Sequence, residues 1–219
     1  NEFDSRINNL NMLDPGDRKK QGILMKKKLE YSAIPGQIRN SKTRPYFLWK
    51  LNFFEVFQEK GGFDVVIANP PYDVMDGMSK DMIQENFVAA IRNGGKYQYA
   101  FGGKLNLYRL FIERGFQLTK RAGALTYIVP STLLADCSTV GLRQLFEQNT
   151  AIEYFIEIPE KTKVFENVTQ AIVVFLLQKI RSENNFKIAV NLRSKVLPPE
   201  KFISMNWKEI REISGQDLG

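Results

Sequence analysis

Histidine is absent from this sequence of 219 residues, and cysteine occurs only once, at Cys137. Without histidine the sequence excludes catalytic triads built on imidazole, imidazole general bases and histidine metal sites. A single cysteine excludes a disulfide framework and fits a reducing compartment, so we expect a cytoplasmic protein. Cys137 itself is better explained as a small residue where a helix begins than as a nucleophile.

Long apolar runs are also missing. No run approaches the roughly 20 residues of a membrane span, and there is no signal peptide, so we expect no membrane partner. Glycine pairs occur at 61–62, 94–95 and 102–103, but none follows a first strand and opens a helix, as a dinucleotide-binding fingerprint requires. The sequence therefore lacks a recognisable turn of that kind.

Acidic residues are scarce in one segment, residues 18–50, which carries ten Lys and Arg against the single acid Glu30. That segment is +9 by count, so the rest of the chain is −2 within a total of +7. Such an excess attracts a phosphate backbone with strong dependence on salt. The alternative is a solvated helix face whose counter-charges lie elsewhere, and the sequence leaves both open.

The most informative residues are Asn69, Pro70, Pro71 and Tyr72, which follow the apolar run 63–68. The run has the composition of a buried strand, and two prolines end it. Open α/β sheets bind their ligands at the carboxyl ends of their strands. The alternative is a Pro-Pro turn that only ends the strand.

These residue types suit one chemistry, the holding of a flat conjugated amine for attack on an electrophile. The Asn69 amide oxygen and the Pro70 carbonyl could each accept one N–H hydrogen bond and favour a tetrahedral nitrogen. Pro70 and Pro71 stiffen the turn because proline fixes φ. Tyr72 offers a ring for stacking a base, an interaction worth about 1–3 kcal/mol.

Strands and helices alternate after residue 60, the pattern of a doubly wound parallel α/β sheet. We predict strands at 63–68, 124–129, 152–158 and 171–178, and helices near 79–92, 106–120 and 138–149. We predict three parts: a basic helical segment at 1–60, a core at 61–180, and a linker with further elements at 181–219. In the first part we expect helices at 19–33 and 48–59, with turns at 14–16 and 34–36. In the third we expect a strand at 186–192 and a helix around 207–213. The long link between residues 72 and 104 is either a lid over the site or a disordered insertion.

Further motifs occur in order along the chain, at residues 103–115, 123–131 and 163–168. With Asn69-Pro70-Pro71-Tyr72 they resemble the N6-adenine DNA methyltransferases of restriction–modification systems, most of all the γ-type and type IIG enzymes. The resemblance covers roughly residues 47–180. It implies a Rossmann-like methyltransferase fold, of which this chain holds the carboxyl-terminal half of the sheet behind a helical segment, with an antiparallel last strand pair.

The same resemblance implies S-adenosylmethionine as cofactor and double-stranded DNA as partner, with no metal. It makes Asn69, Pro70, Pro71 and Tyr72 the catalytic motif, Tyr72 and Phe165 the walls of the target-base pocket, and Asn69 a cofactor contact. The family's glycine-rich turn and ribose-binding acid have no counterpart here, so we expect a fragment that is inactive alone. Residues 181–219 begin a target-recognition region by resemblance.

Two other functions remain open from the sequence. A methyltransferase on RNA or on a protein glutamine amide uses the same tetrapeptide, although the basic segment and residues 106–113 argue against it. A catalytically incomplete DNA-binding fragment is the other alternative. In the favoured reading Asn106 and Tyr108 are a helix cap and a buried ring, and Pro130 and Ser131 are structural.

Overall fold

The computed structural model describes residues 7–11, 14–40, 47–75, 82–163, 169–183, 185–192, 199 and 201–214. The chain divides into two compact units, Asn1–Phe54 and Glu55–Gly219. No helix in these ranges is long and apolar enough to cross a membrane.

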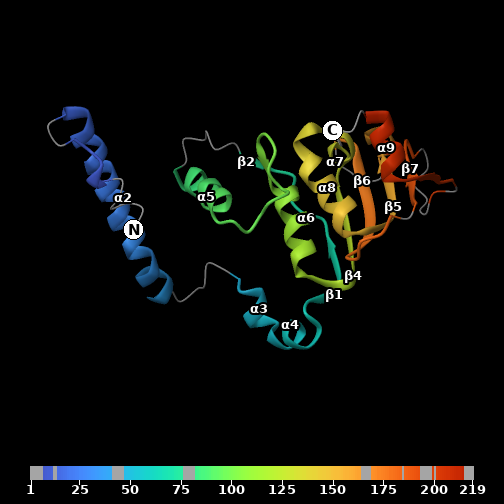
Figure 1. Ribbon diagram of the computed structural model, residues 1–219, viewed down its shortest axis with the longest axis horizontal. Helices are drawn as coiled ribbons and strands as arrows, with labels where there is room; N and C mark the ends of the chain where they lie inside the picture. The colour runs from blue at the N-terminus through green and yellow to red at the C-terminus, as the bar shows by residue number, and fades with distance from the viewer. Residues whose placement is uncertain are drawn as a thin grey trace. The chain divides into compact units, whose positions relative to one another are not determined.

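The first unit is dominated by the helix α2, Pro15–Asn40 (Figure 1). It begins at Pro15, four residues before the predicted start at 19 and within the predicted turn 14–16. The Gly16 N–H donates to Asp14 Oδ1 at 2.7 Å, and proline suits the first helical position. It contains the predicted basic helix, but it also runs through residues 34–36, where the predicted turn is wrong. Pro and Gly within a helix cost about 3 and 1 kcal/mol, a penalty that does not forbid it.

The predicted helix 48–59 is divided at Phe53 into α3, Trp49–Asn52, and α4, Phe54–Lys60. Phe53 leaves the helical region, with φ −120° and ψ 43°. Its ring stacks on that of Trp49, with centroids 6.0 Å apart. Aromatic packing in this sequence therefore competes with helix continuity.

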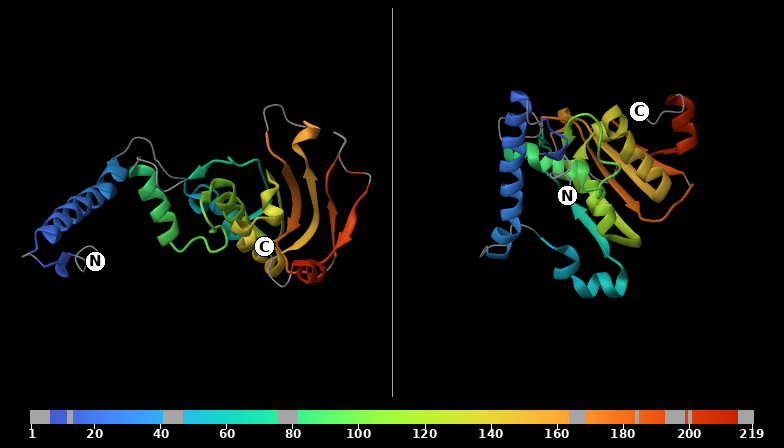
Figure 2. Two further views of the ribbon diagram at one scale, coloured as in Figure 1. Left: turned by 90° about the horizontal axis from the view of Figure 1, so that it is seen from above. Right: turned by 60° about the vertical axis from the view of Figure 1, so that its left-hand side comes forward.

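The second unit is built on one sheet of six strands in the order β1-β4-β6-β5-β7-β8, drawn from teal to red in Figures 1 and 2. Their bounds are β1 Phe63–Ala68, β4 Thr119–Pro130, β5 Ala151–Ile158, β6 Ile172–Gln178, β7 Phe186–Ala189 and β8 Ile203–Met205. All four strands predicted in the core are present. β5 and β6 are antiparallel, as the resemblance implied, and β1 with β4 and β5 with β7 are parallel.

Helices cover one face of this sheet and form its main core. They are α6 Leu107–Leu118, α7 Thr132–Ala135 and α8 Val140–Asn149, with the 3₁₀ turn η1 Cys137–Thr139 before α8. Their buried side chains meet those of β4, β5, β6 and β7 around Phe146 and Phe175, whose ring centroids lie 5.4 Å apart. A smaller cluster of strand and loop residues around Ile156, Ile158 and Ile172 lies on the opposite face.

β1 is an edge strand in the part of the chain that the structure describes, since it pairs only with β4. Val66 and Ala68 pack against the main core. Val65 and Ile67, which point to the other face, are 54% and 75% exposed. An apolar strand with one open edge and one open face therefore leads into Asn69.

The link between residues 72 and 104 carries structure of its own. β2, Val74–Met75, pairs antiparallel with β3, Leu105–Asn106. The end of the link therefore lies close to the residues that directly follow the motif 69–72. Between them lies α5, Met82–Asn93, which confirms the predicted helix. α5 and the following loop share a second cluster that contains Val88, Ala100 and Leu110. The part of the link that is described is thus packed.

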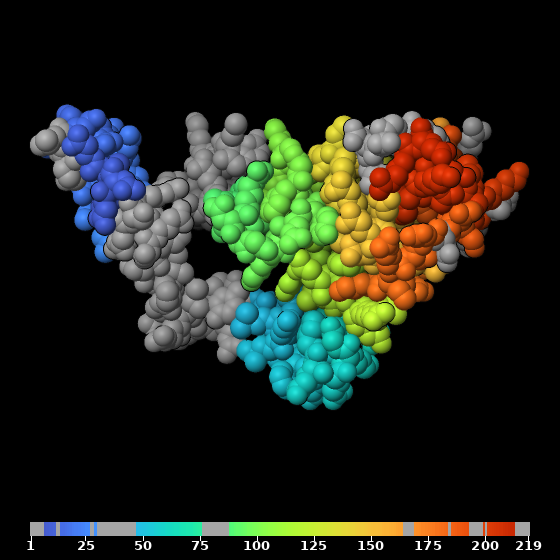
Figure 3. All heavy atoms as spheres, in the orientation of Figure 1, coloured from blue at the N-terminus to red at the C-terminus, as the bar shows by residue number. Residues whose placement is uncertain are grey.

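The elements after residue 180 extend the same sheet. β7 begins where predicted but ends at Ala189, three residues before the predicted end at 192. The helix α9, Trp207–Ser214, falls where it was predicted, whereas β8 was not foreseen. α9 is held to α8 by Arg211, whose guanidinium donates to the Glu147 carboxylate at 2.6 Å. Figure 3 shows the red atoms of α9 directly against the yellow and orange atoms of their neighbours.

Candidate functional site

Asn69 stands at the carboxyl end of β1 and is exposed, while Pro70 behind it is buried and Pro71 is exposed. The buried ring holds the turn against the protein and leaves the Asn69 amide accessible. The structure therefore places the motif at the strand end, as the sequence predicts. Its catalytic role is still a prediction at this point.

Tyr72 folds back toward the sheet and joins the motif to β4. Its hydroxyl lies 3.2 Å from Asn69 Oδ1 and 3.1 Å from the Ile128 carbonyl oxygen. Its half-buried ring packs against the clusters on both faces. Burial raises the pKa of Tyr72 above its ordinary value, so the hydroxyl keeps its proton at neutral pH.

The start of α6 is tied to the motif. The Leu107 N–H donates to the Asp73 carbonyl at 3.0 Å, directly after Tyr72. The Asn106 side chain caps α6 by accepting from the Tyr108 N–H, and the buried Tyr108 hydroxyl lies 3.2 Å from Thr132 Oγ1. The interpretation of this pair as a helix cap and a buried ring is confirmed.

Two buried charged residues on α6 hold the loop before it, and the sequence reasoning did not single them out. Glu113, 3% exposed, accepts from the backbone N–H groups of Gln98, Tyr99 and Ala100 at 2.7, 2.9 and 2.8 Å. Arg109, 2% exposed, donates to the carbonyls of Gly102, Lys104 and Ser138.

Glu113 thus accepts hydrogen bonds from the N–H groups of the loop. Arg109, one helical turn earlier on α6, donates hydrogen bonds to backbone carbonyls. A Cβ at Gly102 would collide with the Ser138 backbone, so glycine is required where the loop meets η1. In the sequence the two residues appear only as an Arg and a Glu four residues apart in an amphipathic helix, a spacing typical of an ion pair, and it does not reveal these backbone partners.

Other predicted residues are structural or lie outside the described residues. The Ser131 N–H donates to the Ala171 carbonyl at 3.0 Å, so Ser131 helps to close the sheet beside Pro130, the last residue of β4. Cys137 is exposed in η1, in keeping with the start of a helix. Phe165, the predicted second wall of the base pocket, lies outside the described residues.

Among the residues that the structure describes, none forms a cradle for S-adenosylmethionine. A Cβ added at several glycines of the second unit would collide with neighbouring atoms of the protein itself. At Gly62, for example, it would lie 2.5 Å from the Leu118 carbonyl oxygen. Gly61 and Gly95 have positive φ but open space around them. The expected contact between Asn69 and the cofactor stays a prediction.

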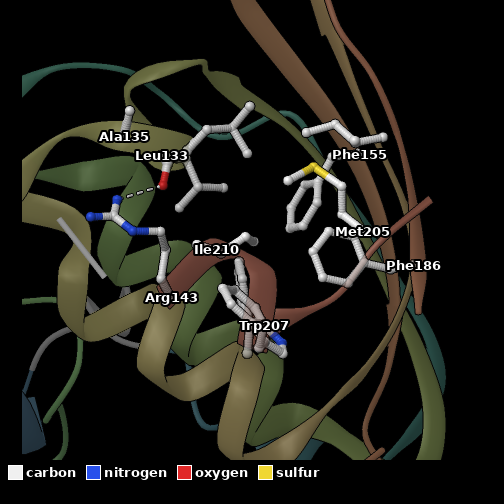
Figure 4. A pocket seen from close by; sticks show the side chains of 11 residues that line it. Leu133, Ala135, Arg143, Phe155, Phe186, Met205, Trp207 and Ile210 are labelled. Carbon is white, nitrogen blue, oxygen red and sulfur yellow. Dashed lines mark hydrogen bonds between the residues drawn. The ribbon is translucent and has the colours of Figure 1, made fainter. Parts of the chain in front are cut away.

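A cavity of about 360 Å³ lies apart from the motif, between α7, α8, α9 and the strands β5, β7 and β8. Figure 4 shows Phe155, Phe186 and Met205 facing Leu133 and Ile210 across it. Its lining is apolar except for Arg143, which donates to the Leu133 carbonyl at 3.0 Å. None of the residues 69–72 lines this cavity.

The sheet and the placement of its helices define the class. The fold is a mixed α/β fold in which helices cover one face of a six-stranded sheet, and it is similar to that of one solved type IIG enzyme. The type IIG restriction endonuclease BpuSI matches over 70% of this chain and 20% of its own, with a TM-score of 0.52 and 18% identity.

The family follows from the sequence comparison. Residues 5–165 match the model of the Eco57I restriction-modification methylase family, and the chain belongs to that family. It is 28% identical over 143 residues to the type II restriction enzyme and methyltransferase RM.Eco57I of Escherichia coli, covering 65% of this chain and 14% of that protein. It is 30% identical over 116 residues to the type II methyltransferase M.TthHB8I of Thermus thermophilus, covering 51% of this chain and 26% of that protein. The chain thus spans about a quarter or less of these relatives.

Proposed function

We propose that the protein containing this chain transfers a methyl group from S-adenosylmethionine to N6 of adenine in duplex DNA, as part of a restriction–modification or phage-defence system. The observation that carries the proposal is Asn69, exposed at the carboxyl end of β1 with Tyr72 folded beside it. Membership of a restriction-modification methylase family supports it. When bound, S-adenosylmethionine supplies an electrophilic methyl group.

The chain's own residues act on the accepting amine. The lone pair of an exocyclic amine on adenine is delocalised into the ring, which makes the amine a poor nucleophile. The Asn69 amide oxygen and the Pro70 carbonyl accept its two N–H bonds and favour a tetrahedral nitrogen with a free lone pair. The buried Pro70 ring fixes the turn that holds these acceptors.

The target base must leave the DNA stack to reach Asn69, which costs a few kcal/mol. Stacking on Tyr72, with Phe165 as the opposite wall, offsets part of this cost at about 1–3 kcal/mol per aromatic contact. S-adenosylmethionine, when bound, would supply a methyl group that is already activated by its sulfonium, so no cysteine nucleophile is needed. Cys137, exposed in η1, stands outside the motif, which argues against methylation of cytosine C5.

The basic segment 18–50 supplies attraction to the phosphate backbone. Arg18, Lys19, Lys20 and Lys26 on α2 are all exposed, although Lys20 also pairs with Asp17 at 3.0 Å. This segment favours a nucleic acid over a protein glutamine as substrate.

A second candidate function is a DNA-binding piece that is inactive by itself. The absence of a cofactor cradle among the described residues favours it for the isolated chain. Both functions hold together if the remainder of the protein contributes the cofactor-binding half of the site.

The test is methyl transfer from isotopically labelled S-adenosylmethionine by the full-length protein to unmethylated duplex DNA. Digestion to nucleosides should show the label as N6-methyladenine, and Asn69→Ala should lower the rate by at least a hundredfold. Asn93→Ala, at an exposed position of α5, is a matched control and should leave the rate unchanged. Label on RNA or on protein, with none on DNA, would refute the proposal.

A further inference from the structure

The Tyr72 hydroxyl has one proton and two acceptors within reach. Asn69 Oδ1 lies 3.2 Å and the Ile128 carbonyl oxygen 3.1 Å from it. A phenol can donate only one hydrogen bond, although its oxygen can also accept. With the Asn69 oxygen facing the hydroxyl, only one of the two acceptor oxygens can receive a hydrogen bond from it.

Turning the Asn69 amide by 180° about its last bond resolves this competition. The amide nitrogen then faces the hydroxyl and donates to it, while the hydroxyl donates to the Ile128 carbonyl. The positions of oxygen and nitrogen exchange in such a turn, so the distances stay nearly the same. All three groups are satisfied, and Asn69 Oδ1 points away from Tyr72 to its exposed side.

The hydroxyl is well placed to impose this orientation. β1 ends at Ala68, opposite Tyr127, so Ile128 lies one residue beyond the last pair between β1 and β4. The Tyr72 hydroxyl engages this carbonyl past the end of the strand. The ring cannot drift easily, because it packs against the clusters on both faces of the sheet.

We infer that the Tyr72 hydroxyl is a positioning group that fixes the Asn69 amide with its oxygen toward the target amine. The inference rests on the proposed function for the identity of that amine. It separates two parts of one side chain: the ring stacks the base, and the hydroxyl, anchored on the Ile128 carbonyl, orients the acceptor. An Asn69 amide that is free to turn presents its NH₂ group part of the time, and that group repels an amine N–H.

The test is Tyr72→Phe in the full-length protein, which keeps the ring and removes the hydroxyl. We expect kcat for DNA methylation to fall about tenfold, with KM for DNA within twofold, in keeping with the loss of one orienting hydrogen bond. Fluorescence of 2-aminopurine at the target position should stay as in wild type, because the stacking ring remains. Tyr154→Phe, on the same face of the sheet, is the matched control and should leave kcat unchanged.

A double-mutant cycle checks that the hydroxyl acts through Asn69. In the Asn69→Ala background, removing the hydroxyl should change the residual rate by less than twofold. An additional tenfold loss there, or wild-type kcat in Tyr72→Phe alone, would overturn the inference.

A readout that needs no substrate keeps this inference apart from the proposed function. In protein labelled with ¹⁵N-asparagine, the side-chain NH₂ signal of Asn69 is assigned by its loss in Asn69→Ala. Tyr72→Phe should shift it toward the position of a solvated amide, and an unchanged signal counts against the inference. If wild type methylates no DNA, the proposed function fails, and this signal alone decides the role of the hydroxyl.

Discussion

Removing the Glu113 carboxylate should loosen the loop that precedes α6. The carboxylate accepts three backbone hydrogen bonds, from Gln98, Tyr99 and Ala100. The Ala100 N–H is buried, whereas the other two donors are partly accessible and can turn to water. Glu113→Ala therefore orphans one donor fully and weakens the packing of the loop on η1.

The magnitude follows from these contacts. A hydrogen bond to a charged group is worth about 1.5–3 kcal/mol, and an orphaned buried donor costs about 1–3 kcal/mol. The variant also removes the cost of burying the carboxylate, which offsets part of the loss. We therefore expect opening of the loop to become easier by about 3 kcal/mol, which is on the order of a hundredfold in the opening constant.

Hydrogen exchange measured by mass spectrometry on the full-length protein gives the local readout. Peptides that cover residues 96–104 should exchange on the order of a hundredfold faster in Glu113→Ala, at about 1.4 kcal/mol per tenfold. Glu183→Ala is the control, because its side chain is 86% exposed in a surface pair with Arg181. Exchange within threefold of wild type in Glu113→Ala would refute the account of the loop.

Two further predictions concern pH and salt. Burial raises the pKa of Tyr127 to about 12, above the ordinary value of 10.0, so its contribution to stability is complete below pH 10 and is lost as pH rises toward 12. Tyr127→Phe should reduce the fall in unfolding free energy over that window in chemical denaturation, and an unchanged slope would contradict this. On α2, the double variant Lys19→Gln/Lys26→Gln should lower the slope of log Kd for DNA against log salt by about two. An identical slope would mean that these exposed side chains form only a solvated face.

The strands of the core could be predicted because their composition is decisive. β1, β5 and β6 are nearly continuous apolar runs, and the structure starts and ends them within one residue of the prediction. β4 begins five residues earlier than predicted, at Thr119, in a polar stretch that contains Ala122 with φ 58°. β8 has three residues and, in the part of the chain that the structure describes, pairs with β7 alone, so its position depends on a partner strand and not on its own pattern.

The candidate site was predictable only in its first element. Asn69 lies where a strand run meets two prolines, and both signals are local. The Tyr72 hydroxyl bonds to the backbone carbonyl of Ile128, 56 residues away. Every residue has such a carbonyl, so the sequence does not indicate which one is the partner. Arg109 and Glu113 were missed for the same reason, since their partners are backbone groups of a loop whose path depends on the fold.

In the described part of the chain one edge of β1 is unpaired, which has a practical consequence for the purification of this chain. Its backbone N–H and C=O groups on that side, beside exposed Val65 and Ile67, form a template on which another extended segment can pair. A second molecule at high concentration is such a segment, and so is a designed peptide with an alternating apolar pattern. The strand that presents Asn69 is thus also the place where self-association of this chain is expected to begin, and where a synthetic strand could be used to block it.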